Sequence, residues 1–330
     1  MRLATTLFSF TNEWLTRRYT LGQLLARVAE LGLGPGVELI GFQAWRRFPE
    51  LPTQEILSFR RLVDDLGLEP AALEGSVDLA RRVDRLMTEQ EAVDFLRPQV
   101  ETAAALGFQM LRLHSGIPIA VLEQVAPLAE RAGVTLATEI QGAQTPDDPA
   151  VAAVIECRER LGSPSVALVL DFSVAMTTVP SRFVETILRL GMRQEDLDAI
   201  IELWAKGSTP RELHATLADV DAPPAALDET RAGFFRFGRQ DPQAWRPLVP
   251  YVAYVHAKFW ELDDAGDEPT TRNEEMFDVL CNGGYAGFVA SEWGGNAWTD
   301  ADEVDAFVLV RRHHELCRSL ISKEAVEVPA

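Results

Sequence analysis

Cysteines and basic residues are scarce in this sequence, and each scarcity excludes a class of protein. The three cysteines, Cys157, Cys281 and Cys317, include no pair with CxxC spacing, so neither a structural zinc site nor a disulfide framework is expected. Reduced thiols suit the cytoplasm, where we expect the protein to reside. The 50 acidic residues outnumber the 31 basic ones and give a formal net charge of −19. Nucleic acids and anionic membranes carry the same sign of charge, so neither is an expected partner.

Long apolar runs are absent as well. No stretch approaches the roughly 18 apolar residues that a membrane-spanning helix needs, and the N-terminal MRLATTLFSF has no apolar run or cleavage site typical of a secretion signal. Hydrophobic residues nevertheless make up 47% of the chain, which is enough for a sizeable core. They form short apolar runs that alternate with longer amphipathic segments, the pattern of an α/β protein.

Eight of the short apolar runs are predicted to be β-strands. They are LATTLF (3–8), VELIGF (37–42), PAALEG (70–75), MLRLHSG (110–116), TLATEIQG (135–142), VALVLDFS (166–173), VAYVHAKFW (252–260) and GFVASEWGG (287–295). Segments with helical spacing lie between them, and glycines mark where several of these helices must end. Eight such units in one series predict a single (β/α)8 TIM barrel domain over residues 1–330. A doubly wound sheet is the alternative, but it rarely needs eight repeats.

One interval breaks this rhythm. Strands six and seven begin about 85 residues apart, whereas most neighbouring strands are about 25 to 40 residues apart. We therefore predict a helical insertion at residues 181–250, after the carboxyl end of a strand, where the active sites of such barrels lie. Its expected role is a lid or an oligomer contact, and the alternative is a decoration without function.

Four strands in succession carry an ionisable residue near their carboxyl ends. These residues are Glu139 in ATEIQG, Asp171 in LVLDFS, His256 in YVHAKF and Glu292 in ASEWGG. A charge inside an apolar strand is costly unless it is paired or coordinated, so four at one rim indicate a shared centre. Three carboxylates and one imidazole suit Mn²⁺, Mg²⁺, Co²⁺ or Fe²⁺ better than a thiolate-preferring metal. The alternative is a salt-bridge network around Lys258 and Arg112.

Two further residues at this rim are candidates for catalysis. Lys258 follows His256 by two residues and so faces the same side of its strand. It is expected to stabilise an oxyanion or a sugar hydroxyl, or else to pair with one of the ligands. His114 ends strand four and is a candidate general acid or base, with a structural hydrogen bond as the alternative.

Substrate contacts are expected from polar and aromatic residues at the same face. Glu74 and Gln141 end strands three and five, and four tryptophans follow or end strands: Trp14, Trp45, Trp260 and Trp293. Sugars and aryl groups stack on such rings, although core packing is the alternative for at least half of them. His313 and His314, in the last helical segment, are expected at the surface.

In these motifs the chain resembles the xylose-isomerase-like barrel superfamily of sugar phosphate isomerases and epimerases. In that family a Glu, an Asp, a His and a Glu on strands five to eight hold one divalent metal, usually Mn²⁺, and they match Glu139, Asp171, His256 and Glu292 here. In its ketose epimerases the two glutamates act as acid and base on opposite faces of the substrate. The resemblance therefore implies an isomerase or epimerase that abstracts a proton beside the carbonyl of a keto-sugar through a metal-stabilised enediolate.

One branch fits the sequence in more detail. The HAKFW and SEWGG contexts and the longer chain resemble the large subunits of C-glycoside deglycosidases, which cleave the sugar–aryl carbon bond of 3-oxo-glucosides. This resemblance implies a carbon–carbon lyase in which His114 protonates the aromatic leaving group, and a small β-rich partner subunit. The implied alternative is a homo-oligomer. Val174 stands where many relatives have a histidine, and no glycine-rich phosphate loop is present, which disfavours a simple phosphosugar or free ketose.

Two other classes are less consistent with the sequence. DNA-repair endonucleases of this barrel type need extra histidines and a basic groove, whereas this chain has five histidines and a charge of −19. A binding barrel without catalytic activity is the remaining alternative.

Overall fold

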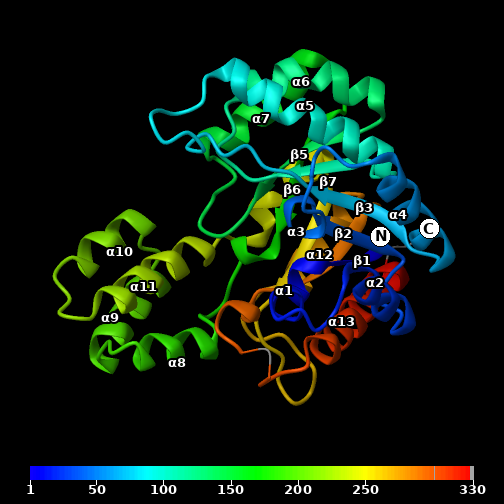
Figure 1. Ribbon diagram of the computed structural model, residues 1–330. Coiled ribbons are helices and arrows are strands. Elements are labelled where there is room, and N and C mark those ends of the chain that lie inside the picture. Colours follow the sequence, from blue (N-terminus) through cyan, green and yellow to red (C-terminus); the bar gives the residue numbers. More distant parts are fainter. Residues whose placement is uncertain (301, 328–330) are drawn as a thin grey trace.

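The computed structural model describes residues 1–300 and 302–327. Eight parallel strands, hydrogen-bonded in chain order, close into a barrel in which β8 pairs with β1 (Figure 1). The strands are β1 (Arg2–Thr6), β2 (Gly36–Ile40), β3 (Glu69–Glu74), β4 (Met110–Leu113), β5 (Thr135–Ile140), β6 (Val166–Asp171), β7 (Val252–Phe259) and β8 (Phe288–Trp293). The predicted TIM barrel is confirmed.

Helices cover the outside of the barrel. The longer ones are α2 (Leu21–Glu30), α4 (Thr53–Asp65), α5 (Glu89–Leu106), α6 (Ile119–Ala132), α7 (Pro149–Leu161), α12 (Asn273–Asn282) and α13 (Ala306–Glu327). Short helical turns are η1 (Leu7–Phe10), α1 (Thr11–Leu15), α3 (Gly41–Ala44), η2 (Phe172–Val174) and η4 (Gly295–Ala297), and a 3-10 helix, η3 (Pro242–Tyr251), precedes β7. Within the described residues, no helix is long and apolar enough to cross a membrane.

Local sequence explains where these helices begin and end. At the start of α5, the Thr88 hydroxyl accepts the backbone N–H of Glu91, and the Glu91 carboxylate accepts the backbone N–H of Thr88. The same helix ends at Gly107, whose φ of 95° suits glycine because it has no Cβ. Such start and stop signals fix the lengths of the βα units, and hence where each strand ends.

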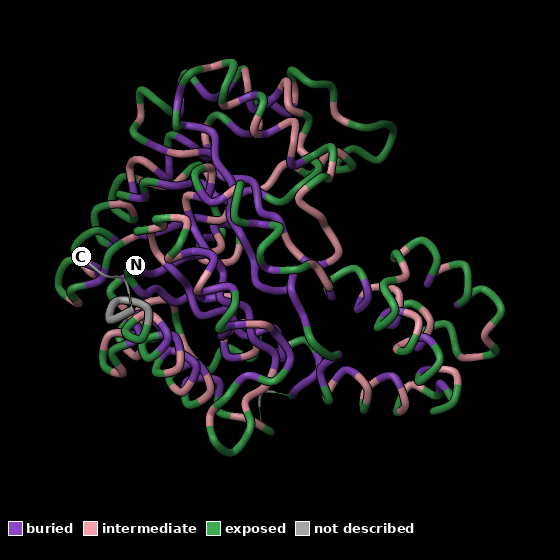
Figure 2. The backbone as a smooth tube through the Cα atoms, turned by 180° about the vertical axis from the view of Figure 1, so that it is seen from behind, coloured by how far each residue is buried: buried purple, intermediate pink, exposed green. Residues whose placement is uncertain are grey.

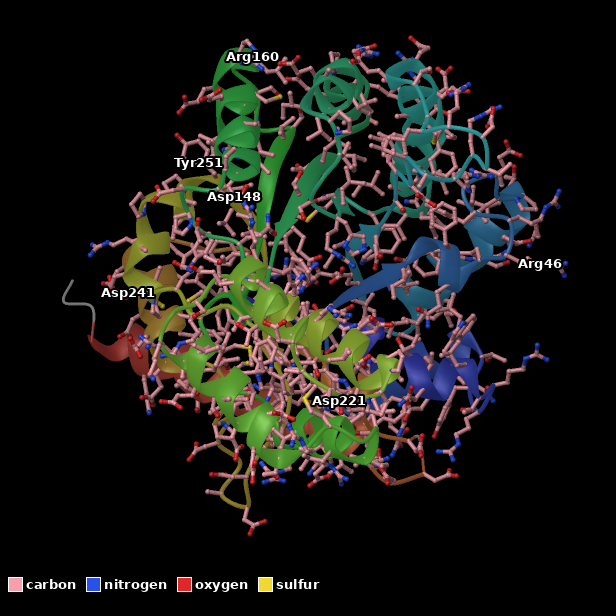
Figure 3. The ribbon with its side chains drawn as sticks, turned by 90° about the vertical axis from the view of Figure 1, so that its left-hand side faces the viewer. Arg46, Asp148, Arg160, Asp221, Asp241 and Tyr251 are labelled. Carbon is pink, nitrogen blue, oxygen red and sulfur yellow. The ribbon has the colours of Figure 1, made fainter. Side chains whose placement is uncertain are left out.

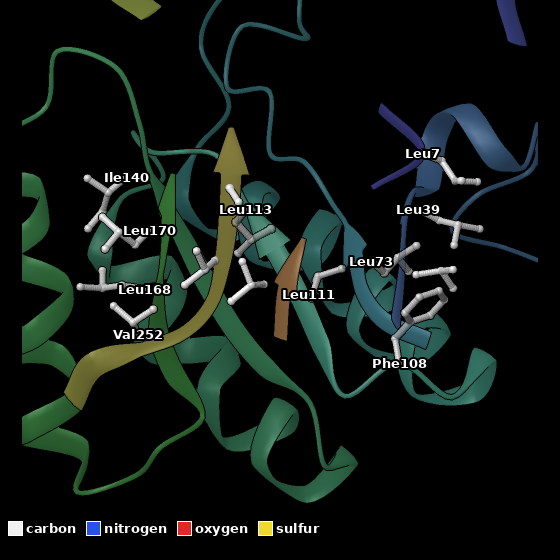
Figure 4. Packing of buried hydrophobic residues seen from close by; sticks show 14 of the residues in the cluster. Leu7, Leu39, Leu73, Phe108, Leu111, Leu113, Ile140, Leu168, Leu170 and Val252 are labelled. Atoms are coloured by element: carbon white, nitrogen blue, oxygen red, sulfur yellow. The ribbon is translucent and has the colours of Figure 1, made fainter. Parts of the chain in front are cut away.

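The main hydrophobic core lies between the strands and the surrounding helices. Leu111, Leu168 and Val252 are among the residues that pack in this layer (Figure 4). The strands form the buried centre of the molecule, and the helices around them are only partly buried (Figure 2). His313 on α13 belongs to this layer as well: its ring stacks on Phe259 with centroids 4.0 Å apart.

The expectation of surface histidines in the last helix is therefore wrong. His313 and His314 are both buried, because one face of α13 packs against β8. The Ser291 hydroxyl of β8 lies 3.0 Å from His313 Nδ1, so the polar ring is satisfied inside the apolar layer.

The inner face of the barrel has two kinds of residue in separate layers. Because side chains alternate along a strand, residues two apart point the same way. Ala137 therefore lies below Glu139, and Ala290 lies below Glu292, with the small residues in one buried interior cluster. The layer of ionisable residues sits above this packed layer, at the carboxyl ends of the strands.

Four helices form a lobe beside the barrel mouth. This helical lobe (181–236) comprises α8 (Ser181–Arg189), α9 (Gln194–Ala205), α10 (Pro210–Leu217) and α11 (Pro224–Arg236), and it projects to the left in Figure 1. In Figure 3 the lobe faces the viewer, with Asp221 between α10 and α11. The lobe has its own buried cluster, which includes Phe183 and Trp204 and is joined by Trp260 and Trp298 from the barrel.

The helical lobe falls within the predicted insertion at 181–250. A role as lid or oligomer contact stays a prediction.

Candidate metal and substrate site

The four predicted ligands converge at the carboxyl ends of β5 to β8. One ligand atom from each of Glu139, Asp171, His256 and Glu292 lies within 4.8 Å of all the others, and all four residues are buried. The strand register explains this: Asp171 pairs directly with His256 across β6 and β7. Neighbouring strands at the same height therefore bring residues that are distant in sequence to one point.

His256 Nδ1 lies at the centre of the group. It is 2.7 Å from Glu139 Oε1, 2.7 Å from Glu292 Oε2 and 3.7 Å from Asp171 Oδ2. Glu292 Oε2 and Asp171 Oδ2 are buried and make no hydrogen bond. Buried carboxylate oxygens without a hydrogen bond are unusual, because desolvating them is costly. A cation among them would offset that cost.

The charges at the site also favour a cation. Two negative charges remain uncompensated when His114 is charged and His256 is neutral, since three cations, Arg112, Lys258 and His114, face five carboxylates: Glu38, Glu74, Glu139, Asp171 and Glu292. Burial alone disfavours a charged imidazole, but the carboxylates raise the pKa of His256 well above its ordinary value. A set of three carboxylates and one imidazole suits a hard divalent ion. The residues therefore fit a divalent metal.

Glu38 lies behind His256, on the side away from the ligands. It is fully buried on β2, and its Oε2 is 2.7 Å from His256 Nε2. In the arrangement that suits a metal ligand, Nε2–H donates to Glu38, and the Nδ1 lone pair faces the carboxylate oxygens of the other strands. Glu38 therefore orients His256 and selects its tautomer.

A salt-bridge network surrounds the four ligands, and the four ligand atoms still converge on one point inside it. Arg112 Nε donates to Glu38 at 2.6 Å, Arg112 Nη1 donates to Glu139 Oε2 at 2.6 Å, and the same guanidinium pairs with Glu74. Lys258 Nζ donates to Glu292 Oε1 at 2.5 Å. The salt-bridge network predicted as the alternative is thus present. It binds only one oxygen of Glu139 and one of Glu292, and the second oxygen of each glutamate faces His256.

Ion pairing also fixes the charge of Glu292. Burial would raise the pKa of this carboxyl, but the positive charges of His256 and Lys258 outweigh burial and lower it to about 2. Glu292 therefore stays ionised at neutral pH, with one oxygen directed at the centre of the site.

His114 stands at the rim, beside the ligand group. Its Nε2 lies 2.9 Å from Glu74 Oε1, and its Nδ1 lies 3.5 Å from Glu139 Oε2. Hydrogen bonds to Glu139 and Glu74 raise the pKa of His114 to about 9. The imidazole is therefore charged at neutral pH and able to donate a proton, and its half-exposed side chain reaches the open cavity.

A cavity of about 540 Å³ opens above these residues, a volume within the ~300–1,000 Å³ range typical of ligand pockets. Its lining includes the predicted residues Glu74, Gln141, Trp260, His114, Lys258, Glu139 and Glu292. Gln141 Nε2 also donates to Glu139 Oε2 at 3.4 Å. The cavity therefore connects the ligand group with most of the predicted substrate contacts.

Three predicted substrate contacts lie elsewhere, and each has a packing reason. Trp293 follows Glu292 and so points to the opposite side of β8, where its Nε1 donates to the Trp260 carbonyl oxygen. Trp45 is buried edge-on against Phe59. Trp14 lines a separate narrow crevice among leucines. None of these three tryptophans lines the cavity that holds the other predicted substrate contacts.

Some residues at the site were not among the sequence candidates, and Arg112 was considered only as part of a salt-bridge network. Glu38 and Arg112 interrupt the apolar runs VELIGF and MLRLHSG, which is the same signal that indicated the four ligands. Phe235 and Arg236 line the cavity from the end of α11. No local pattern marks these two, because their position depends on how the helical lobe meets the barrel.

Comparisons with known proteins agree with this architecture. Residues 25–226 match the family model described as xylose isomerase-like TIM barrel. The chain is 31% identical to the 3'-dehydrocarminate deglycosidase alpha subunit of Microbacterium sp, over 99% of this chain and 97% of that protein. It is 33% identical to a C-glycoside deglycosidase alpha subunit of Arthrobacter globiformis, over 99% of this chain and 94% of that protein.

A solved structure of L-ribulose 3-epimerase shares the fold. It superposes with a TM-score of 0.59 at 15% sequence identity, covering 99% of this chain and 96% of that one. At this identity the likeness concerns the fold alone.

Proposed function

Because the chain belongs to the xylose isomerase-like TIM barrel family, we propose that it cleaves the carbon–carbon bond between a 3-oxo sugar and an aromatic group. Similarity over nearly the whole length to proteins named deglycosidase alpha subunits carries this proposal. The epimerase likeness, at 15% identity, extends only to the fold. The carbon–carbon lyase expected as the alternative is therefore better supported than a keto-sugar isomerase or epimerase.

We assign one divalent cation to Glu139, Asp171, His256 and Glu292. The hard donor set favours Mn²⁺, with Mg²⁺ and Co²⁺ as alternatives. When bound, such a cation stabilises negative charge that develops on the sugar oxygens.

The chain's own residues supply the proton transfers. In a 3-oxo sugar the proton on C2 is acidic because it is next to the carbonyl, and the aromatic group sits on C1. Glu292 is ionised and lines the cavity, and its Oε1, the oxygen that does not face His256, takes the C2 proton. Lys258, which donates to the same Oε1, places a positive charge beside the developing oxyanion.

The electron pair released at C2 forms a C1=C2 double bond and expels the aromatic group from C1. His114 donates a proton to the departing aromatic carbon, because Glu139 and Glu74 keep its imidazole charged. His114 follows β4 and Glu292 lies on β8, which are opposite in the barrel order. Acid and base are therefore on different sides of the substrate. One proton leaves and one is added, giving an unsaturated keto sugar and a free aromatic compound.

We also propose that the chain works with a second subunit. The relatives carry the name alpha subunit, which supports a multi-subunit enzyme. A small β-rich subunit is the partner that the family resemblance implies. A cytoplasmic location stays a prediction.

Product analysis tests the reaction. The protein, with any subunit that co-purifies from its native cells, is incubated with Mn²⁺ and a phenolic 3-oxo-C-glucoside. The expected products are a free phenol and an unsaturated keto sugar. Treatment of the protein with a chelator should stop the formation of both. Epimerised sugar with the aromatic group still attached would instead support an epimerase.

Two variants test the proton transfers. Glu292→Gln and Glu139→Gln should keep the fold, since each replacement has nearly the same shape, and should abolish turnover. A near-normal rate in either variant would show that its assigned role is wrong.

A further inference from the structure

The end of the helical lobe forms part of the cavity wall. Phe235 and Arg236, at the end of α11, line the cavity together with residues of the barrel mouth. Phe235 is 57% exposed, and among the exposed large apolar side chains in the described part of the chain, it alone lines this cavity. Aromatic side chains that line a cavity are typical contacts for a ligand bound there.

Backbone contacts hold this end of the lobe in place. Ala143 N donates to Phe235 O at 3.1 Å, and Gly238 N donates to Ser173 O at 2.8 Å. A Cβ added to Gly142 would lie 2.1 Å from Phe235 O, so glycine is required for this approach.

These contacts tie the lobe to the loops that follow β5 and β6. The loops begin at the ligand strands that carry Glu139 and Asp171. Phe235 and Arg236 therefore occupy a fixed position relative to the ligand group. This end of the lobe is a fixed wall, which favours preorganised binding.

Arg236 adds charge to the same wall. Its Nη1 lies 3.9 Å from Glu229 Oε1, a long ion pair at a side chain that is 44% exposed. Such a pair is weak and leaves guanidinium donors for an anion. Arginine suits carboxylate and phenolate oxygens because its planar donors match them.

We propose that Phe235 and Arg236, together with Trp260, form the subsite for the aromatic group of the substrate, and that it prefers aromatic groups bearing a carboxylate or phenolate. The identification of this group as the leaving group rests on the proposed function. The capacity to bind an aromatic anion rests on the wall itself.

Equilibrium binding tests the subsite with two probes, 4-hydroxybenzoate and its uncharged methyl ester. The wild-type protein should bind the acid more tightly than the ester. Phe235→Leu should weaken both probes by about threefold to tenfold, because the ring contact is lost. Arg236→Gln should weaken the acid by at least about fivefold and leave the ester unchanged, because only the acid carries the charge.

Matched controls come from outside the cavity. Phe42 is another exposed phenylalanine, and Arg46 extends into solvent (Figure 3). Neither lines the cavity, so Phe42→Leu and Arg46→Gln should bind both probes as the wild type does. Unchanged affinity in the Phe235 and Arg236 variants would overturn the proposal, as would equal losses in the control variants.

The outcome is separable from that of the proposed function because binding needs no turnover. Selective probe binding without release of an aromatic product from a C-glucoside would retain the subsite and reject the lyase. Release of the aromatic product by the wild type, with probe affinities unaffected by either substitution, would retain the lyase and reject the subsite.

Discussion

Replacing Glu38 by glutamine tests whether the carboxylate behind His256 fixes the nitrogen that faces the metal ligands. Glu38 Oε2 lies 2.7 Å from His256 Nε2, and Glu38 Oε1 accepts from Arg112 Nε at 2.6 Å. Both oxygens face donors, so the amide group of glutamine must direct its NH₂ at one of them. If the NH₂ faces His256, the hydrogen bond to Nε2–H is lost, or the imidazole moves its proton to Nδ1. A proton on Nδ1 would occupy the lone pair that a cation needs.

The expected loss follows from the burial of this pair. Glu38 and His256 are both almost completely buried, so water cannot take the place of the lost acceptor. Removing the outer partner of a ligating histidine typically weakens metal binding about 10- to 100-fold, or ~1.4 to 2.7 kcal/mol. We expect Glu38→Gln to weaken Mn²⁺ binding by that amount.

The measurement is a chelator competition with Mn²⁺, supported by a circular dichroism check of folding. Glu74→Gln is the matched control, because Glu74 contacts Arg112 but is not bonded to His256. We expect Glu74→Gln to stay within about threefold of wild type, since the histidine keeps its outer partner. Wild-type affinity in Glu38→Gln would refute the reasoning. Equal losses in both variants would assign the effect to the arginine network instead.

Two further predictions concern pH and the lobe contact. Because hydrogen bonds to Glu139 and Glu74 raise the pKa of His114 to about 9, the acid form persists through neutral pH and is lost above 9. We expect kcat to fall about tenfold per pH unit beyond that point, and a rate profile flat to pH 10 would contradict this. Gly142 and Gly162 both have left-handed backbones, with φ of 57° and 61°, but only Gly142 approaches a carbonyl of the lobe. In denaturant unfolding, Gly162→Ala should cost about 1–2 kcal/mol and Gly142→Ala about 1–3 kcal/mol more; equal losses would contradict the tight contact.

The alternation of strand side chains explains both the success and the failures of the sequence predictions. Glu139 and Glu292 were found because a charge inside an apolar strand needs a partner. Glu38 gave the same signal in VELIGF, but only the closed barrel shows that Glu38 on β2 reaches His256 on β7. Trp293 was assigned to the cavity although it follows Glu292 directly, and alternation places consecutive residues on opposite faces.

The position of the lobe was beyond the reach of local sequence. The long interval between strands six and seven predicted an insertion at residues 181–250, and the lobe falls within that range. The contact between Gly142 and Phe235 joins a loop after β5 to the end of α11. Such a contact is a property of tertiary packing, and no periodicity in either segment indicates it.

These observations separate what is general at this site from what selects a reaction. The ligand layer rests on a packed interior layer that includes Ala137 and Ala290, and the likeness to an epimerase concerns the fold without implying a shared reaction. Proton removal beside a carbonyl serves epimerisation and bond cleavage equally. Cleavage also requires a proton donor for the leaving group and a surface that holds that group beside C1. In this chain His114 and the wall at Phe235 are the features that would supply those two requirements, so they, more than the ligands, should determine which product forms.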